Sequence, residues 1–105
     1  FENYVSRNLG KPSIIEYRYR SPYFKHIFGS DEYACGYYTY LWAQVLEADA
    51  WNRFEEEGPL NIKTATDYKN YILAPGDTED AMTLYKKFRG HEPNADALLR
   101  LRGLK

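Results

Sequence analysis

The chain has 105 residues, of which 44% are apolar and 28% are charged, and its net charge at pH 7 is −1. This composition fits a globular segment that forms one domain or part of one, and it argues against disorder. The sequence has no basic stripe and no apolar run of about 20 residues, so nucleic acid and membranes are not expected partners. The single cysteine, Cys35, excludes an internal disulfide, which favours the cytoplasm and leaves the periplasm as the alternative.

The first thirty residues combine a helical end with an extended aromatic segment. Residues 1–9 are predicted to form the last turns of a helix that stops at Gly10. Because that helix has no capping residue at Phe1, we expect the chain to be a piece of a longer protein. Residues 14–30 contain Pro22 and a stretch in which tyrosine and arginine alternate. This pattern is typical of extended backbone, so we predict a loop with at most one short turn.

A long helix is predicted over residues 31–57. Ser30 or Asp31 can accept hydrogen bonds from the first backbone amides, and acidic side chains there favour the positive end of the helix dipole. No proline interrupts this range, and the pair Gly58-Pro59 ends it.

Three shorter helices complete the predicted fold, and we place them over residues 65–73, 79–89 and 95–102. Thr64 begins a capping arrangement for the first of them, and Asp77 or Thr78 is predicted to cap the second. Gly90 stops the second helix, and Asn94 caps the third. The predicted class is therefore all-α, with an extended aromatic loop near the start.

Eleven tyrosines stand out in the composition, and three of them are spaced as one face of a helix. Tyr33, Tyr37 and Tyr40 lie at i, i+4 and i+7 of the predicted long helix, just after a glycine-containing segment that carries His26. A phenol is a neutral donor at pH 7, and one donor aimed at a developing oxyanion contributes about 10²–10³ in rate. The same spacing is more often core packing than a site. It also fits a non-catalytic helical module that binds a protein partner.

Residues 23–51 contain the run His-Ile-Phe-Gly-Ser-Asp-Glu-Tyr and, after four intervening residues, the run Tyr-Thr-Tyr-Leu-Trp. This block resembles a signature of the thimet oligopeptidase family of zinc metallopeptidases. Near its end the chain reads Phe-Arg-Gly-His-Glu-Pro, then Asp-Ala-Leu-Leu and Arg-Gly-Leu. That pattern is similar to the C-terminus of the bacterial peptidyl-dipeptidase branch of the same family. The resemblance covers nearly the whole chain.

The resemblance implies roles in peptide hydrolysis for the matching residues. Tyr40 is implied to be the catalytic residue, whose hydroxyl stabilises the oxyanion. His26 and Tyr33 are implied to hold the backbone of the substrate. Tyr37 and Gly29 are counted with the substrate-binding residues, Gly29 because it gives the loop its mobility.

In that family zinc is held by a His-Glu-x-x-His helix and a further glutamate, and this chain lacks that motif. We therefore expect residues 1–105 to be the C-terminal part of the peptidase catalytic domain, with zinc in the full-length enzyme and none in this fragment. The expected full-length protein is a zinc-dependent peptidyl-dipeptidase that releases C-terminal dipeptides from oligopeptides, while the fragment alone is expected to be inactive. An endo-acting oligopeptidase of the same family is the alternative.

The expected partners are an oligopeptide substrate and the missing N-terminal part of the same chain. A tyrosine face left uncovered in the fragment also predicts self-association. Arg18 and Arg20 lie among the tyrosines, and arginine pairs with a carboxylate through two parallel hydrogen bonds. Either arginine therefore suits the free C-terminus of a peptide. A solvated or interdomain salt bridge is the other interpretation.

Overall fold

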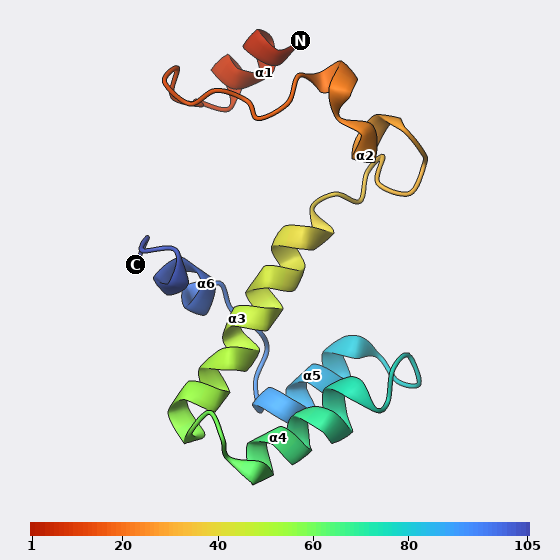
Figure 1. Ribbon diagram of the computed structural model, residues 1–105, viewed down its shortest axis with the longest axis vertical. Coiled ribbons are helices and arrows are strands. Elements are labelled where there is room, and N and C mark those ends of the chain that lie inside the picture. Colours follow the sequence, from red (N-terminus) through yellow and green to blue (C-terminus); the bar gives the residue numbers. More distant parts are fainter. The chain divides into compact units, whose positions relative to one another are not determined.

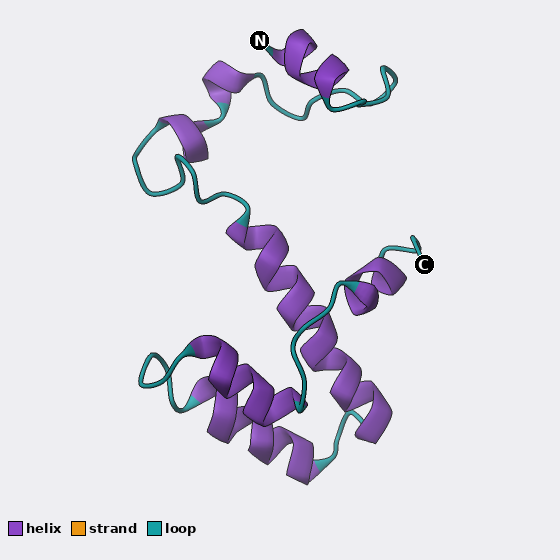
Figure 2. Ribbon diagram, turned by 180° about the vertical axis from the view of Figure 1, so that it is seen from behind, coloured by secondary structure: helices purple, strands orange, loops and turns teal.

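The computed structural model describes all residues from 1 to 105. Its regular elements are all helical and no strand is present (Figure 1, Figure 2), which confirms the predicted all-α class. The chain divides into two compact units, Phe1–Thr39 and Tyr40–Lys105, which we call the N-terminal unit and the C-terminal unit. None of the helices is both long and apolar enough to cross a membrane.

The N-terminal unit consists of short helical segments joined by loops. Helix α1 spans Glu2–Asn8, the 3₁₀ turn η1 spans Ser21–Tyr23 and helix α2 spans Lys25–Phe28. The helix predicted over residues 1–9 is confirmed, whereas residues 14–30 hold two short helical turns where at most one was predicted. Pro22 lies at the start of η1, where its fixed φ suits a helical turn. Glu2 ties α1 to η1, because its Oε1 accepts hydrogen bonds from Ser21 N at 2.6 Å and Ser21 Oγ at 3.1 Å.

The long helix begins later than the sequence predicts. Helix α3 spans Thr39–Glu57, whereas the predicted range was 31–57. Before it the backbone forms tight turns, in which Gly36 N bonds to Tyr33 O at 3.3 Å and Thr39 N bonds to Gly36 O at 3.1 Å. Glycine disfavours a helix by about 1 kcal/mol, and tyrosine and cysteine are only modest helix formers. The capping signal at residues 30–31 therefore does not suffice to start a helix there.

Three helices follow α3 in the C-terminal unit. Helix α4 spans Ile62–Tyr68 and continues as the π-helical turn η2 over Lys69–Leu73, α5 spans Ala81–Arg89, and α6 spans Asp96–Leu101. The segment formed by α4 and η2 lies beside α5 in both views (Figure 1, Figure 2). Each of the three helices predicted from the sequence is present with shifted ends.

Capping side chains explain the shifted starts. Asn61, rather than Thr64, caps α4, because its Oδ1 accepts hydrogen bonds from Lys63 N at 2.9 Å and from Thr64 N at 3.2 Å. Asp80, rather than Asp77 or Thr78, caps α5. Gly90 ends α5 as predicted, with a φ of 82° that glycine adopts without strain.

Both hydrophobic clusters of the molecule lie in the C-terminal unit. The first contains Ala50, Tyr85 and Phe88, with Leu46, Phe54, Tyr68 and Ile72 packed against them. The second contains Ala48, Ala97 and Leu98, with Val45 packed against them. Because Ala48 belongs to α3 and Leu98 to α6, the second cluster holds the last helix against the long one.

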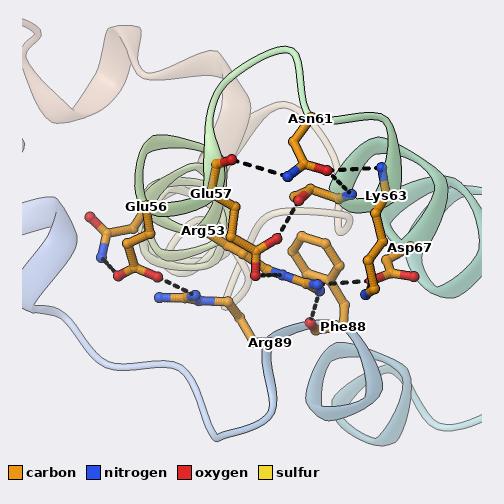
Figure 3. Close-up of polar contacts among 10 residues, drawn as sticks. Arg53, Glu56, Glu57, Asn61, Lys63, Asp67, Phe88 and Arg89 are labelled. Carbon is orange, nitrogen blue, oxygen red and sulfur yellow. Dashed lines mark hydrogen bonds and ion pairs between the residues drawn. The ribbon is translucent and has the colours of Figure 1, made fainter.

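An arginine on α3 joins three helices (Figure 3). Arg53 pairs with Glu57 at 3.1 Å and with Asp67 on α4 at 2.8 Å, and it donates a hydrogen bond to the Phe88 carbonyl on α5. Its guanidinium also lies 4.8 Å from the centroid of the Phe88 ring. A cation beside the last carbonyls of a helix is favoured by the helix dipole. Arg53 therefore fixes the positions of α4 and α5 against α3.

A second arginine is buried with its carboxylate. Arg89 Nη2 lies 3.4 Å from Asp49 Oδ1, and Arg89 Nη1 lies 3.3 Å from Glu56 Oε2. The Tyr85 hydroxyl donates a hydrogen bond of 2.6 Å to Asp49 Oδ2. Burial raises the pKa of the Tyr85 hydroxyl well above its ordinary value, and the bond to Asp49 raises that pKa further. Tyr85 therefore stays a neutral donor to the buried carboxylate.

Candidate functional site

Three of the predicted site residues form a cluster of rings in the N-terminal unit. The centroid of the His26 ring lies 5.6 Å from that of Tyr33 and 5.9 Å from that of Tyr37. The two tyrosine rings meet edge to face with their centroids 6.2 Å apart. Favourable ring contacts have centroid distances of about 4.5–7 Å, so all three pairs are in contact. We call His26, Tyr33 and Tyr37 the ring cluster.

Turns, and not a helix, bring these rings together. His26 lies on α2, whereas Tyr33 and Tyr37 lie in the turns that precede α3. The predicted helical stripe of Tyr33, Tyr37 and Tyr40 is therefore wrong, because only Tyr40 belongs to a helix. Tyr33 and Tyr37 are nevertheless neighbours of His26.

Gly29 has a steric reason to be glycine. It ends α2, where its N donates a hydrogen bond of 2.7 Å to Lys25 O. A Cβ at this position would stand 2.6 Å from Lys25 O and 2.9 Å from Lys25 Cγ, closer than side chains allow. Gly29 thus permits the tight end of the short helix that carries His26. Its predicted contribution to loop mobility stays a prediction.

The ring cluster lies at the surface of the N-terminal unit. His26 is exposed, Tyr33 is half-buried and Tyr37 is 38% exposed. A phenol donates one hydrogen bond, and a neutral imidazole has one donor and one acceptor nitrogen. Side chains of this kind are therefore chemically able to contact a ligand at the surface.

Tyr40, the predicted catalytic residue, lies in the C-terminal unit. It is the second residue of α3 and is 46% exposed. Leu41 is 53% exposed and Trp42 is 46% exposed, so the first turn of α3 presents large apolar side chains to solvent. The oxyanion role of Tyr40 stays a prediction.

Phe24 and Tyr19 extend the row of rings beyond the ring cluster, and the spacing of residues in the sequence does not reveal this. The Phe24 ring meets the Tyr37 ring edge to face at 4.8 Å and stacks on the Tyr19 ring at 5.9 Å. Phe24, Tyr19 and Tyr37 line a groove of about 550 Å³, together with Arg18. Phe24 comes only two residues before His26, and this short separation was the one feature of the sequence that could have indicated their proximity. Its contact with Tyr37 joins residues thirteen positions apart and cannot be read from spacing.

The residues of this chain do not fit the zinc ion that the family resemblance implies. In residues 1–105 no group of three or more histidine, cysteine, aspartate or glutamate side chains is placed to hold a metal ion. Cys35 is a free, exposed thiol.

The sequence profile of peptidase family M3 matches residues 1–104 of the chain. Oligopeptidase A of Haemophilus influenzae is 54% identical over 86 residues, which cover 81% of this chain and 12% of that protein. Dipeptidyl carboxypeptidase of Salmonella typhimurium is 49% identical over 100 residues, which cover 95% of this chain and 14% of that protein. Saccharolysin of Saccharomyces cerevisiae is 42% identical over 81 residues, which cover 77% of this chain and 11% of that protein.

The chain therefore spans 11–14% of the length of these three curated relatives. The matches confirm the family resemblance that residues 23–51 and the end of the chain indicated.

Proposed function

The chain belongs to peptidase family M3. We propose that it is part of a peptidase that hydrolyses oligopeptides and releases dipeptides from their C-terminal ends. The names of two relatives, oligopeptidase A and dipeptidyl carboxypeptidase, support this proposal. The second of these relatives matches 95% of the chain, which supports the release of dipeptides in particular.

The ring cluster is the observation that carries the proposal. His26 and Tyr33 donate hydrogen bonds to the backbone of the bound peptide, and the Tyr37 ring packs against the peptide beside them. Tyr40 donates a hydrogen bond to the oxyanion that forms when the scissile carbonyl is attacked. A neutral donor of this kind contributes about 10²–10³ to the rate. The ring contacts of His26 with both tyrosines support a shared binding surface.

The proposal includes zinc as a cofactor of the longer protein. Because no ligand set in residues 1–105 fits a metal ion, the zinc ligands and the base that activates water are assigned to other parts of that protein. Residues 1–105 bind and orient the substrate. The isolated chain is accordingly proposed to be inactive.

The test is the Tyr40→Phe variant of the full-length protein, which removes one hydroxyl and keeps the ring. We expect the turnover number to fall by about 10²–10³, because the hydrogen bond is made mainly in the transition state. Tyr38→Phe is the matched control, since Tyr38 is close in sequence and 69% exposed. It should leave the turnover number within about twofold of wild type. A Tyr40→Phe variant that turns over as fast as the control would refute the catalytic role and favour a non-catalytic interaction module.

An endo-acting oligopeptidase is the second candidate, supported by the 54% identity to oligopeptidase A. Peptides with a free and with an amidated C-terminus separate the two candidates. A peptidyl-dipeptidase should lose most of its activity on the amide, because it requires the terminal carboxylate. An endo-acting enzyme should cut both peptides at similar rates.

A further inference from the structure

The groove of the N-terminal unit has one basic residue on its wall. Its volume of about 550 Å³ lies within the range of about 300–1,000 Å³ that small-molecule sites show. The wall is mainly aromatic and aliphatic, and it includes Val5, Tyr17, Tyr19, Phe24, Ile27, Phe28 and Tyr37. Arg18 is the only lysine or arginine among the lining residues. Phe1 and the Glu2 carboxylate also line the groove. A mainly apolar groove with a guanidinium on its wall suits a ligand that is apolar along its length and negative at one end.

The guanidinium of Arg18 is oriented by a ring but paired with no carboxylate. It lies 5.3 Å from the centroid of the Tyr19 ring. Stacking on a ring leaves the N–H groups at the edge of the guanidinium able to donate. None of the ion pairs of the chain includes Arg18, whereas Arg53 and Arg89 each pair with two carboxylates. Arg18 therefore keeps its capacity to bind an added carboxylate.

The carboxylate that lines the same groove already has partners. Glu2 Oε1 accepts hydrogen bonds from Ser21 N at 2.6 Å and from Ser21 Oγ at 3.1 Å. These bonds from Ser21 lower the pKa of the Glu2 carboxyl below its ordinary value. Glu2 thus acts as the tie between α1 and η1, and it does not neutralise Arg18.

A row of rings connects Arg18 to the ring cluster. The Tyr19 ring, which contacts Arg18, stacks on Phe24 at 5.9 Å, and Phe24 meets Tyr37 at 4.8 Å. Tyr37 belongs to both the groove and the ring cluster. A peptide whose backbone lies at the ring cluster can therefore extend along the rings toward the guanidinium.

From these contacts we propose that Arg18 binds the free C-terminal carboxylate of the peptide, with an apolar last side chain lying along the row of rings. A planar guanidinium forms two parallel, charge-assisted hydrogen bonds with a carboxylate, which gives both strength and direction. The inference rests on the proposed function for the nature of the ligand. The sequence left undecided whether Arg18 or Arg20 binds a carboxylate. The groove favours Arg18, because Arg20 does not line it and instead precedes η1.

The test is the binding of a dipeptide, alanyl-phenylalanine, to the full-length protein by calorimetry, with the same dipeptide amidated at its C-terminus as the comparison. Wild type should bind the acid more tightly than the amide. Arg18→Gln should weaken binding of the acid by about 10- to 100-fold and leave binding of the amide within about twofold. Arg18→Lys keeps the charge but cannot form two parallel hydrogen bonds, so its affinity for the acid should lie between those of wild type and Arg18→Gln. Arg20→Gln is the matched control and should bind as wild type does.

Equal affinity of wild type for the acid and the amide would overturn the inference. An Arg18→Gln variant whose affinity falls equally for the acid and the amide, or for neither, would also overturn it. A selective loss of affinity for the acid in Arg20→Gln would do the same. The measurement needs no turnover, so it separates the two proposals. If Arg18→Gln selectively loses affinity for the acid but the wild-type protein hydrolyses no peptide, only the proposed function is refuted. If the wild-type protein hydrolyses peptides but Arg18→Gln shows no selective loss of affinity, only the role of Arg18 is refuted.

Discussion

The two compact units differ in what their side chains do. The buried residues all lie in the C-terminal unit, and they are Ala48, Asp49, Ala50, Thr64, Leu84, Tyr85, Phe88, Ala97 and Leu98. The N-terminal unit buries no residue, and its rings contact one another near the surface. Burial of apolar surface is the main source of stability, while side chains near the surface are positioned to contact a ligand. Substitutions should therefore affect folding in one unit and binding in the other.

The largest expected effect is the loss of the main core side chain. Phe88 is 2% exposed and contacts the rings of Phe54 and Tyr68. Phe88→Ala should destabilise the C-terminal unit by about 3–5 kcal/mol, because it removes apolar contacts and leaves a cavity. Amide hydrogen exchange in α4 and α5 of the full-length protein measures this loss. The control is Phe28→Ala, at a 64% exposed position of the N-terminal unit. An equal loss of stability in this control would contradict the view that the core lies in the C-terminal unit alone.

The next effect concerns the buried ion pair. Asp49→Asn should destabilise the same unit by about 3 kcal/mol, because Arg89 keeps its charge and loses a buried partner. Tyr85→Phe removes only the hydroxyl that donates to Asp49 and should cost about 1.5 kcal/mol. Hydrogen exchange in α5 gives both values. A smaller loss for Asp49→Asn than for Tyr85→Phe would show that the charge of Asp49 contributes little.

A smaller effect is expected for a ring contact in the N-terminal unit. Phe24→Leu keeps an apolar side chain but loses the edge-to-face contact with Tyr37, which should cost about 1 kcal/mol. Faster exchange should be confined to amides of the N-terminal unit, and the protection of α5 should not change. Altered exchange in α5 would show that the two units respond as one.

The smallest effect is a loss of stability in acid, because the groups concerned are in contact with solvent. A hydrogen bond from Thr64, followed by one from Arg53, lowers the pKa of Glu57 below its ordinary 4.5. Hydrogen bonds from Lys63 and then from Arg53 lower the pKa of Asp67 below its ordinary 3.8. A carboxyl with a lowered folded pKa stabilises the fold above its ordinary pKa, and that contribution is lost as the pH falls through the folded value.

Protection of the α4 amides, corrected for intrinsic exchange rates, should therefore be constant from neutral pH down to about pH 5 and should fall below about pH 4. The Glu57→Gln variant serves as the control, since it removes one of the two titrating carboxyls and should show a weaker pH dependence. Constant protection of α4 down to about pH 3 would contradict the contribution of these pairs.

The sequence by itself determined the helical class, the existence of five of the helices and several of their ends. These features depend on local chemistry, such as the left-handed turn that Gly90 adopts. The predicted cap of the last helix is wrong, because Ala95 and not Asn94 is the N-cap of α6, although Asn94 Oδ1 accepts a hydrogen bond from Asp96 N. The sequence also determined the family, because residues 23–51 carry a recognisable block. It placed His26, Tyr33 and Tyr37 among the candidates for one site.

Only the tertiary structure decided where α3 begins and which rings meet. The turns before Thr39 and a continuous helix differ by small backbone preferences, so a capping signal could not choose between them. The contact of Phe24 with Tyr37 and the position of Arg18 in the groove depend on how the loop of the N-terminal unit closes on itself. Contacts between distant residues follow from packing, and periodicity within one segment does not record them. For that reason the sequence left Arg18 and Arg20 as equal candidates for binding a carboxylate, and only the folded chain shows that Arg18 lines the groove and Arg20 does not.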